Sequence, residues 1–149
     1  MDKQVEWLAA YVEKCMVAVW DGEVDELGCF GDAFVYRAGS AACMVRVEDT
    51  APVMVRVMAK AVVDVRLTAK LLREINEINA RSRVANVWWH EGEVTVECSL
   101  FAEAVNVESL TEACGHVGAV ANDIGVGMAA MFDGSTPYPP FASDSEEAA

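Results

Sequence analysis

The sequence predicts an α+β domain in which helices and strands follow the order α-β-β-β-α-β-β-α. Three segments repeat apolar residues at three- and four-residue steps, the spacing of one face of a helix. Between them, valine-rich runs alternate apolar and polar residues, which is typical of a half-buried antiparallel sheet. Because an apolar sheet face must be covered, we expect the helices to pack against a five-stranded, mostly antiparallel sheet.

The first half of the chain is expected to form one helix and three strands. The helix covers residues 2–19, and its apolar stripe consists of Val5, Leu8, Val12, Cys15, Met16 and Val19. Strands are expected over residues 34–38, 41–48 and 53–60, with turns at Gly39-Ser40 and Thr50-Ala51-Pro52 between them. The acidic segment that precedes the first strand, which includes Cys29, is expected to be a loop.

The second half begins with a helix over residues 67–80 and continues into a hairpin. The apolar face of the helix consists of Leu67, Leu71, Ile75 and Ile78. A two-residue turn at Glu91-Gly92 pairs His90 with Glu93, Trp88 with Thr95, and Asn86 with Glu97. Since neighbouring residues of a strand point to opposite faces, Trp89 is expected in the core and Trp88 on the other side.

The last helix is expected over residues 107–132, with Asn106 as its N-cap. Its apolar stripe consists of Leu110, Cys114, Val117, Ala121, Ile124, Met128 and Met131. Four glycines (115, 118, 125 and 127) cost this helix about 1 kcal/mol each relative to alanine, which indicates close approach to another element. We expect one domain over residues 1–133, followed by a disordered tail over residues 134–149 that is rich in Pro, Ser and Glu.

Composition excludes several classes of partner. The 149 residues include 11 Lys and Arg against 24 Asp and Glu, a formal net charge of −13. Such an acidic surface repels phosphate groups, so nucleic acid and anionic membranes are not expected to bind. The chain shows no signal peptide and no apolar stretch of about 20 residues, and its five scattered cysteines fit buried free thiols. We therefore expect a cytoplasmic protein.

Catalytic and metal-binding patterns are not found. There are two histidines and no zinc-type ligand spacing, no nucleophile elbow and no phosphate-binding loop, so neither a metal nor a cofactor is expected. An enzyme would have to use Glu93, Glu97 or Cys29. A solvated sheet face, on which the two glutamates pair with Arg46, Arg56 or Lys60, is the simpler interpretation.

Large apolar residues are expected on the outer face of the sheet. They are Met44, Met54, Met58 and Trp88, ringed by Arg46, Arg56 and Glu97. An exposed apolar patch of this kind indicates an interface, and methionine and tryptophan are suited to holding a partner. Three interpretations stay open: a helix of the chain covers this face, a second copy covers it, or it is a groove for a partner. The tail could also fold back over it through Tyr138 and Phe141.

The segment REINEIN and the hairpin that follows carry a family resemblance. Residues 72–101, with Ile75-Asn76 and Ile78-Asn79 in the helix, resemble the YbjN family. That family is described as bacterial sensory transduction regulators and belongs to a wider group with the fold of type III secretion chaperones, which includes YbjN-like peptide-binding chaperones of actinobacteria. The resemblance extends over about residues 2–132 and implies a non-enzymatic, homodimeric protein that binds polypeptides.

The sequence thus leads to one main hypothesis and one alternative. The main hypothesis is a chaperone-like protein that binds protein or peptide segments through its sheet and helix surface. The alternative is a regulatory domain that senses a small molecule, in which the same patch lines a closed pocket. Asn76 and Asn79 are expected to have structural roles, Asn79 at the end of its helix and Asn76 toward a neighbouring loop.

Overall fold

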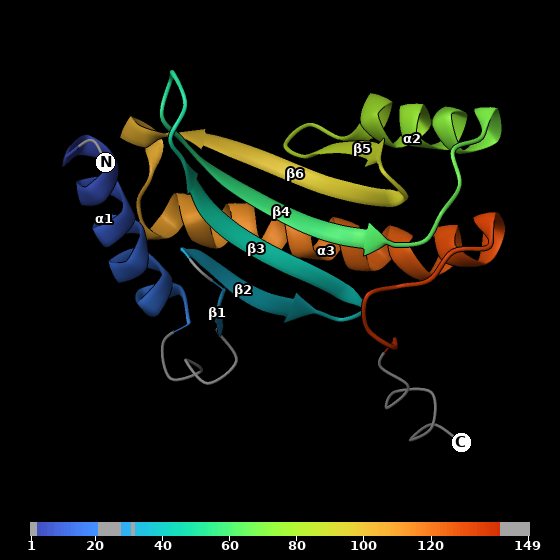
Figure 1. Cartoon of the computed structure of the whole chain (residues 1–149), viewed down its shortest axis with the longest axis horizontal. Coiled ribbons are helices and arrows are strands. Elements are labelled where there is room, and N and C mark those ends of the chain that lie inside the picture. The colour runs from blue at the N-terminus through green and yellow to red at the C-terminus, as the bar shows by residue number, and fades with distance from the viewer. Residues whose placement is uncertain (1–2, 21–27, 31, 141–149) are drawn as a thin grey trace.

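An antiparallel sheet with helices against one side forms the protein, seen in the computed structural model of Figure 1, which describes residues 3–20, 28–30 and 32–140. The helices are α1 (Lys3–Val19), α2 (Ala69–Arg81), the short 3₁₀ helix η2 (Ala102–Ala104) and α3 (Val107–Phe132). The strands are β1 (Gly28–Phe30), β2 (Ala33–Ala38), β3 (Ala41–Glu48), β4 (Met54–Val62), β5 (Asn86–His90) and β6 (Glu93–Phe101). The predicted α+β class and the order of its elements are confirmed.

The five predicted strands are joined by one more at the edge of the sheet. The sheet has six strands in the order β1-β2-β3-β4-β6-β5, and all neighbours are antiparallel. The additional strand β1 is three residues long and includes Cys29, where the sequence predicted a loop. A run of three residues is too short for alternation to reveal it.

The predicted register of the β5–β6 hairpin is confirmed. His90 pairs with Glu93, and the two-residue turn has positive φ values of 48° at Glu91 and 87° at Gly92. Positive φ at both central positions defines the type I′ turn that matches the twist of the strands, and glycine adopts this conformation readily. Trp89 faces the helices, and its ring N–H donates a hydrogen bond of 2.9 Å to the carbonyl oxygen of Val65.

The core lies between this sheet and the helices. It contains the predicted valines of β3 and β4, the stripe of α1 and most of the predicted stripes of α2 and α3. Two predicted core residues are exposed, Leu67 and Met131. Leu67 precedes α2 because Thr68 is its N-cap and accepts a hydrogen bond of 3.0 Å from the Leu71 amide. At the end of α3 the apolar stripe continues through Phe132, so Met131 points away from the sheet.

Two of the four glycines of α3 explain how closely this helix approaches the sheet. A Cβ atom on Gly118 would lie 2.9 Å from the Cβ of Ala38, and one on Gly125 would lie 2.8 Å from the carbonyl oxygen of Ala61. Gly115 and Gly127 have no neighbour within 4 Å of such an atom. Close approach therefore accounts for Gly118 and Gly125 alone. In the described part of the chain, no helix is long and apolar enough to span a membrane.

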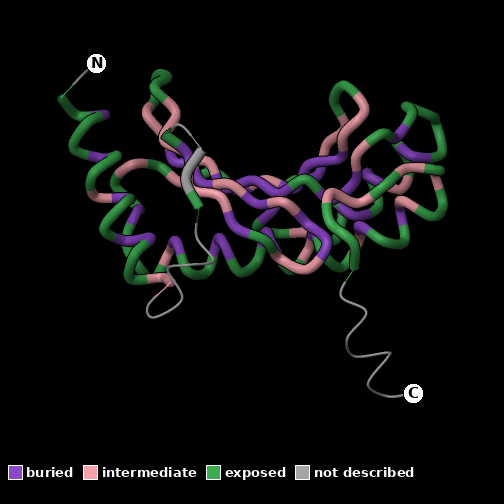
Figure 2. Tube along the Cα trace, turned by 60° about the horizontal axis from the view of Figure 1, so that its bottom comes forward, coloured by how far each residue is buried: buried purple, intermediate pink, exposed green. Residues whose placement is uncertain are grey.

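The other face of the sheet is open and concave. Helix α3 lies behind the sheet in Figure 1 and beneath it in Figure 2, where the sheet dips between two raised ends. Helices α1 and α2 share the same core with α3, so the described helices all pack on one side. The interpretation in which a helix of the chain covers the outer face is therefore wrong for the described residues.

The segment that follows α3 differs from the prediction of a disordered tail. Residues 134–140, which we call the C-terminal strap, lie against the end of the sheet. The amide of Val63 donates to the carbonyl oxygen of Ser135 at 2.7 Å, and the amide of Ser135 donates to the carbonyl oxygen of Val63 at 2.9 Å. Proline and serine enrichment did not reveal these long-range contacts. Residues 141–149 of the predicted tail lie outside the described residues.

Candidate functional site

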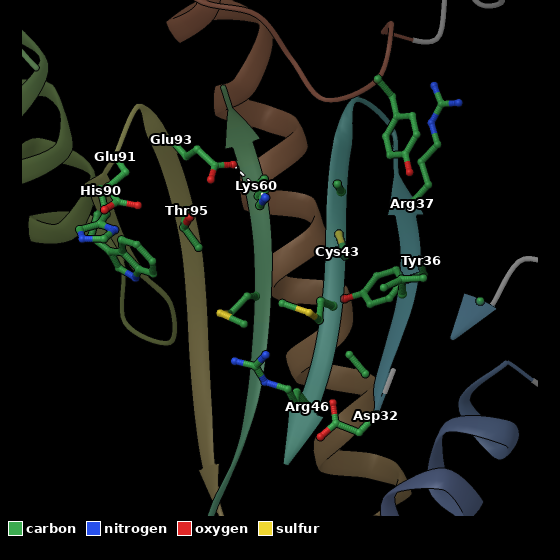
Figure 3. Close-up of a pocket in the computed structure, with 18 residues that line it drawn as sticks. Asp32, Tyr36, Arg37, Cys43, Arg46, Lys60, His90, Glu91, Glu93 and Thr95 are labelled. Atoms are coloured by element: carbon green, nitrogen blue, oxygen red, sulfur yellow. Dashed lines mark ion pairs between the residues drawn. The ribbon is translucent and has the colours of Figure 1, made fainter. Parts of the chain in front are cut away.

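A groove of about 940 Å³ crosses the open face of the sheet from β1 to β5 (Figure 3). Each strand of the sheet contributes at least one residue to its lining. In Figure 3, Asp32 and Arg46 lie toward one side of the groove, and Lys60 and Glu93 lie toward the other. The groove therefore runs across the strands rather than along one of them.

The floor of the groove is apolar. Val35, Met44 and Met58 lie side by side on β2, β3 and β4, because the register pairs Val35 with Met44 and Met44 with Met58. Trp88 continues the floor on β5 and pairs with Thr95 of β6. Met58 is 8% exposed although it faces away from the helices, so its neighbours on this face cover most of it.

The walls of the groove carry charges of both signs in equal number. The cations are Arg37, Arg46 and Lys60, and the carboxylates are Asp32, Glu91 and Glu93. Lys60 Nζ lies 3.0 Å from a carboxylate oxygen of Glu93, the pairing that the sequence predicted for these residues. In a chain with a net charge of −13, this is a locally balanced region.

An ion-pair network borders the groove on the side of Arg46. Arg56 contacts Glu97 through two nitrogens, at 3.0 and 2.7 Å. Glu48 accepts from Arg46 at 2.8 Å and from Arg56 at 3.1 Å. The indole N–H of Trp88 donates to Glu97 at 3.1 Å, so the network holds the orientation of the groove's tryptophan.

The network keeps its carboxylates ionised. Hydrogen bonds from Arg46 and then Arg56 lower the pKa of Glu48. Burial opposes ionisation of Glu97, but the hydrogen bonds and charge of Arg56 and the Trp88 N–H outweigh it, so its pKa is also lowered. The hydrogen bond to Glu97 is the largest cause of the raised pKa of Arg56. A carboxylate held in this state is suited to orienting neighbours and is a poor proton donor at neutral pH.

The residues predicted for this site separate into two groups. Met44, Met58, Trp88 and Arg46 line the groove. Met54, Arg56 and Glu97 lie on the same face but outside the lining: Met54 pairs with Phe101 near the end of β6, and Arg56 and Glu97 belong to the network.

Sequence reasoning missed other lining residues. Val35 and Arg37 line the groove and could have been predicted from the alternation of β2. Thr95 could have been predicted from its pairing with Trp88. His90 was predicted as a partner of Glu93, which the register confirms, but its place at the groove was not foreseen. Tyr138 comes from the C-terminal strap, and no local pattern places it beside β2.

The described cysteines are buried thiols rather than reactive groups. Cys15, Cys43, Cys98 and Cys114 are free and buried. Burial raises the pKa of Cys43 to about 12 and that of Cys114 to about 11. Cys29 is described only through its backbone in β1. Within the described ranges, no group of three or more His, Cys, Asp and Glu residues could hold a metal ion.

Asn79 of the REINEIN segment has a structural role that differs from the expected one. Its amide nitrogen donates to the carbonyl oxygen of Val87 at 2.9 Å, and its amide oxygen accepts from the Val87 N–H at 2.8 Å. The side chain thereby satisfies backbone groups on the outer edge of β5 instead of capping its own helix. Strand edges with unpaired groups invite pairing with other chains, so this contact also closes part of the sheet edge.

Comparison with protein families agrees with this architecture. The family model TY-Chap1, described as "T3SS (YopN, CesT) and YbjN peptide-binding chaperone 1", matches residues 6–140. The match begins in α1, ends with the C-terminal strap, and includes the groove. No curated protein matches the chain significantly. The family is one of peptide-binding chaperones rather than of enzymes, which confirms the resemblance carried by residues 72–101. By the extent of this match, the chain belongs to the TY-Chap1 family of peptide-binding chaperones.

Proposed function

We propose that this protein binds an extended polypeptide segment in the groove on the open face of its sheet. The observation that carries the proposal is a groove that crosses six strands on the side away from the described helices, with an apolar floor of Val35, Met44, Met58 and Trp88. Membership of a peptide-binding family supports a polypeptide as the occupant. The residues proposed to contact it are Met44, Met58, Trp88 and Arg46, while Met54, Arg56 and Glu97 flank them or hold them in place.

The dimensions of the groove indicate the length of the segment. Neighbouring strands lie about 4.8 Å apart, so a path across six of them is about 24 Å long. An extended chain advances about 3.3 Å per residue, so this path holds about seven residues. Side chains of an extended chain alternate in direction, and three or four of the seven would face the apolar floor.

The charges of the groove favour a segment with little net charge. Equal numbers of cations and carboxylates line it, and Lys60 is already paired with Glu93. A strongly charged segment would therefore meet as much repulsion as attraction. Burial of apolar side chains against Met44, Met58 and Trp88 supplies the main driving force in this proposal.

An array of heptapeptides tests the proposal. Members should carry Leu, Met or Phe at alternate positions with uncharged residues between them, next to scrambled members in which the apolar residues are adjacent. We expect the full-length protein to bind the alternating peptides saturably and in preference to the scrambled ones, as measured by calorimetry on the peptides selected from the array.

Two methionine variants make the test specific to the groove. Met44→Asp places a charge in the floor, and we expect it to weaken peptide binding by about tenfold or more, equivalent to about 1.4 kcal/mol. Met131→Asp makes the same chemical change at an exposed position of α3, on the other side of the molecule, and should leave the affinity unchanged. Equal affinities of both variants and the wild type would refute the groove as the binding site.

The small-molecule alternative makes a different prediction. A volume of about 940 Å³ is within the range of ligand pockets, although this groove is open to solvent where the alternative requires a closed pocket. A metabolite that copurifies with the protein and is lost in Met44→Asp, together with no binding to the peptide array, would favour that alternative.

The homodimer implied by the resemblance stays a prediction. Helix α1 exposes Trp7, which stacks on Tyr11 with ring centroids 5.4 Å apart, and Val17 is also exposed. These side chains lie outside the groove lining and would leave it accessible if they formed a contact between copies. Light scattering after size exclusion measures the oligomeric state directly.

A further inference from the structure

One end of the groove is occupied by the C-terminal strap. The amide of Tyr138 donates to the carbonyl oxygen of Ser40 at 3.1 Å, which places the tyrosine beside the β2–β3 turn. Tyr138 is 39% exposed and lines the groove together with Arg37. Figure 3 shows Arg37 below the strap as it descends from α3.

Arg37 holds this part of the strap. Its Nη2 donates to the carbonyl oxygen of Pro139 at 2.8 Å, and its Nε donates to the carbonyl oxygen of Gly39 at 2.6 Å. The guanidinium carbon lies 4.7 Å from the centre of the Tyr138 ring, within cation–π distance. One side chain of β2 thus contacts both the backbone of the strap and its tyrosine ring.

The two ends of the strap are held with different strength. At its beginning, Ser135 and Val63 exchange two backbone hydrogen bonds. Gly134 packs closely there, because a Cβ atom on it would lie 3.0 Å from a side-chain carbon of Val62 and 3.1 Å from the Cβ of Val65. Around Tyr138, the hydrogen bond from Arg37 to Pro139 is exposed, and a cation–π contact at an exposed site contributes little net stability.

Proline enrichment keeps the far end of the strap loosely tied. Prolines occupy positions 137, 139 and 140, and proline has no backbone N–H to donate. Tyr138 is therefore the residue of this stretch that can donate from its backbone, and it uses that donor on Ser40. The strap can open at Tyr138 while its anchor at Ser135 remains paired.

We propose that Tyr138 is a built-in occupant of the groove and that a bound polypeptide displaces it. The proposal deepens the peptide-binding function and depends on it. The strap places the aromatic ring of Tyr138 at the β2 end of the groove, where one end of a bound polypeptide segment would lie. A segment must compete with Tyr138 for the β2 end of the groove. The strap therefore lowers the apparent affinity of every segment, and only segments with a high intrinsic affinity remain bound.

The test uses the full-length chain and a heptapeptide with leucines at alternate positions and uncharged polar residues between them. Tyr138→Ala removes the ring that occupies the groove, and we expect it to bind this peptide about tenfold tighter than the wild type, equivalent to about 1.4 kcal/mol. Tyr138→Phe keeps the ring over Arg37 and should bind like the wild type. Calorimetry gives the three affinities.

Hydrogen exchange of the Tyr138 amide adds a direct measurement of displacement. In the free wild type this amide is bonded to Ser40, and saturating peptide should speed its exchange while the Ser135 amide stays protected. Equal or weaker binding by Tyr138→Ala, or an unchanged Tyr138 amide at saturation, would overturn the strap proposal and leave the groove as the binding site. If none of the three proteins binds, the proposed function fails and the strap proposal fails with it.

Discussion

Replacing Asn79 by alanine should destabilise the protein through the edge of its sheet. The Asn79 side chain makes two hydrogen bonds to the backbone of Val87, at 2.9 and 2.8 Å. Each such bond contributes about 1 kcal/mol net, so the substitution should cost about 2 kcal/mol of unfolding free energy. Alanine is the better helix former and returns up to about 0.5 kcal/mol, which leaves a net loss of about 1.5 kcal/mol.

Asn76 offers a matched control in the same helix. It is an exposed asparagine three residues earlier, so Asn76→Ala gains the same helix propensity without removing the contact to β5. The two variants should therefore differ by about 2 kcal/mol in unfolding free energy. Urea denaturation followed by circular dichroism measures both, and the Val87 amide should exchange faster in Asn79→Ala alone.

Equal stability of the two variants would refute this reasoning. It would mean that pairing with β6 and packing in the core are sufficient to hold β5. It would also mean that the Asn79–Val87 hydrogen bonds add no more stability than hydrogen bonds from the same groups to water. A loss in Asn79→Ala without faster exchange at Val87 would likewise place the effect elsewhere in the molecule.

Two further predictions concern packing and pH. Gly125→Ala should destabilise the protein despite its gain in helix propensity, because the new Cβ would lie 2.8 Å from the Ala61 carbonyl oxygen. In Gly127→Ala, the new Cβ has no neighbour within 4 Å, so this substitution should stabilise the protein by up to about 1 kcal/mol. Thermal unfolding of the two variants distinguishes them, and equal changes in melting temperature would contradict the close contact at Gly125. Because Arg56 helps lower the pKa of Glu97 in the folded state, the ionised carboxylate stabilises the fold above its unfolded pKa of about 4.3. That contribution is lost as the pH falls through the lower folded pKa. The difference in unfolding free energy between wild type and Glu97→Gln should therefore narrow as the pH falls below about 4.3, and a difference independent of pH would contradict this prediction.

Helix caps and strand faces were predictable because their causes are local. Asn106 accepts a hydrogen bond from Ser109 and forms the expected cap of α3. Alternation along β3 and β4 placed Met44 and Met58 on the outer face, and the two-residue turn set the register that brings Trp88 opposite Thr95. These features depend on neighbours a few residues apart, whose spacing is visible in the chain.

The limits of prediction appear where contacts join distant segments. The short strand β1 depends on pairing with β2 and has too few residues to show a period. Met54 shares the alternation of Met58, yet only Met58 lines the groove, because the curvature of the sheet and its neighbours decide which outer residues meet. The exposed end of the helical stripe at Met131 was missed for a related reason, since α3 continues its contact through Phe132.

By itself, the sequence determined the order of helices and strands, the residues on each face of the sheet and the family to which the chain belongs. The tertiary structure alone decided that the described helices gather on one face and leave the other open, and that the open face forms a groove across six strands. It also brought Pro139 to Arg37 across 102 positions of the chain. The physical reason is that periodicity specifies which side of an element is apolar, whereas the partner of that side is chosen by the packing of the whole chain.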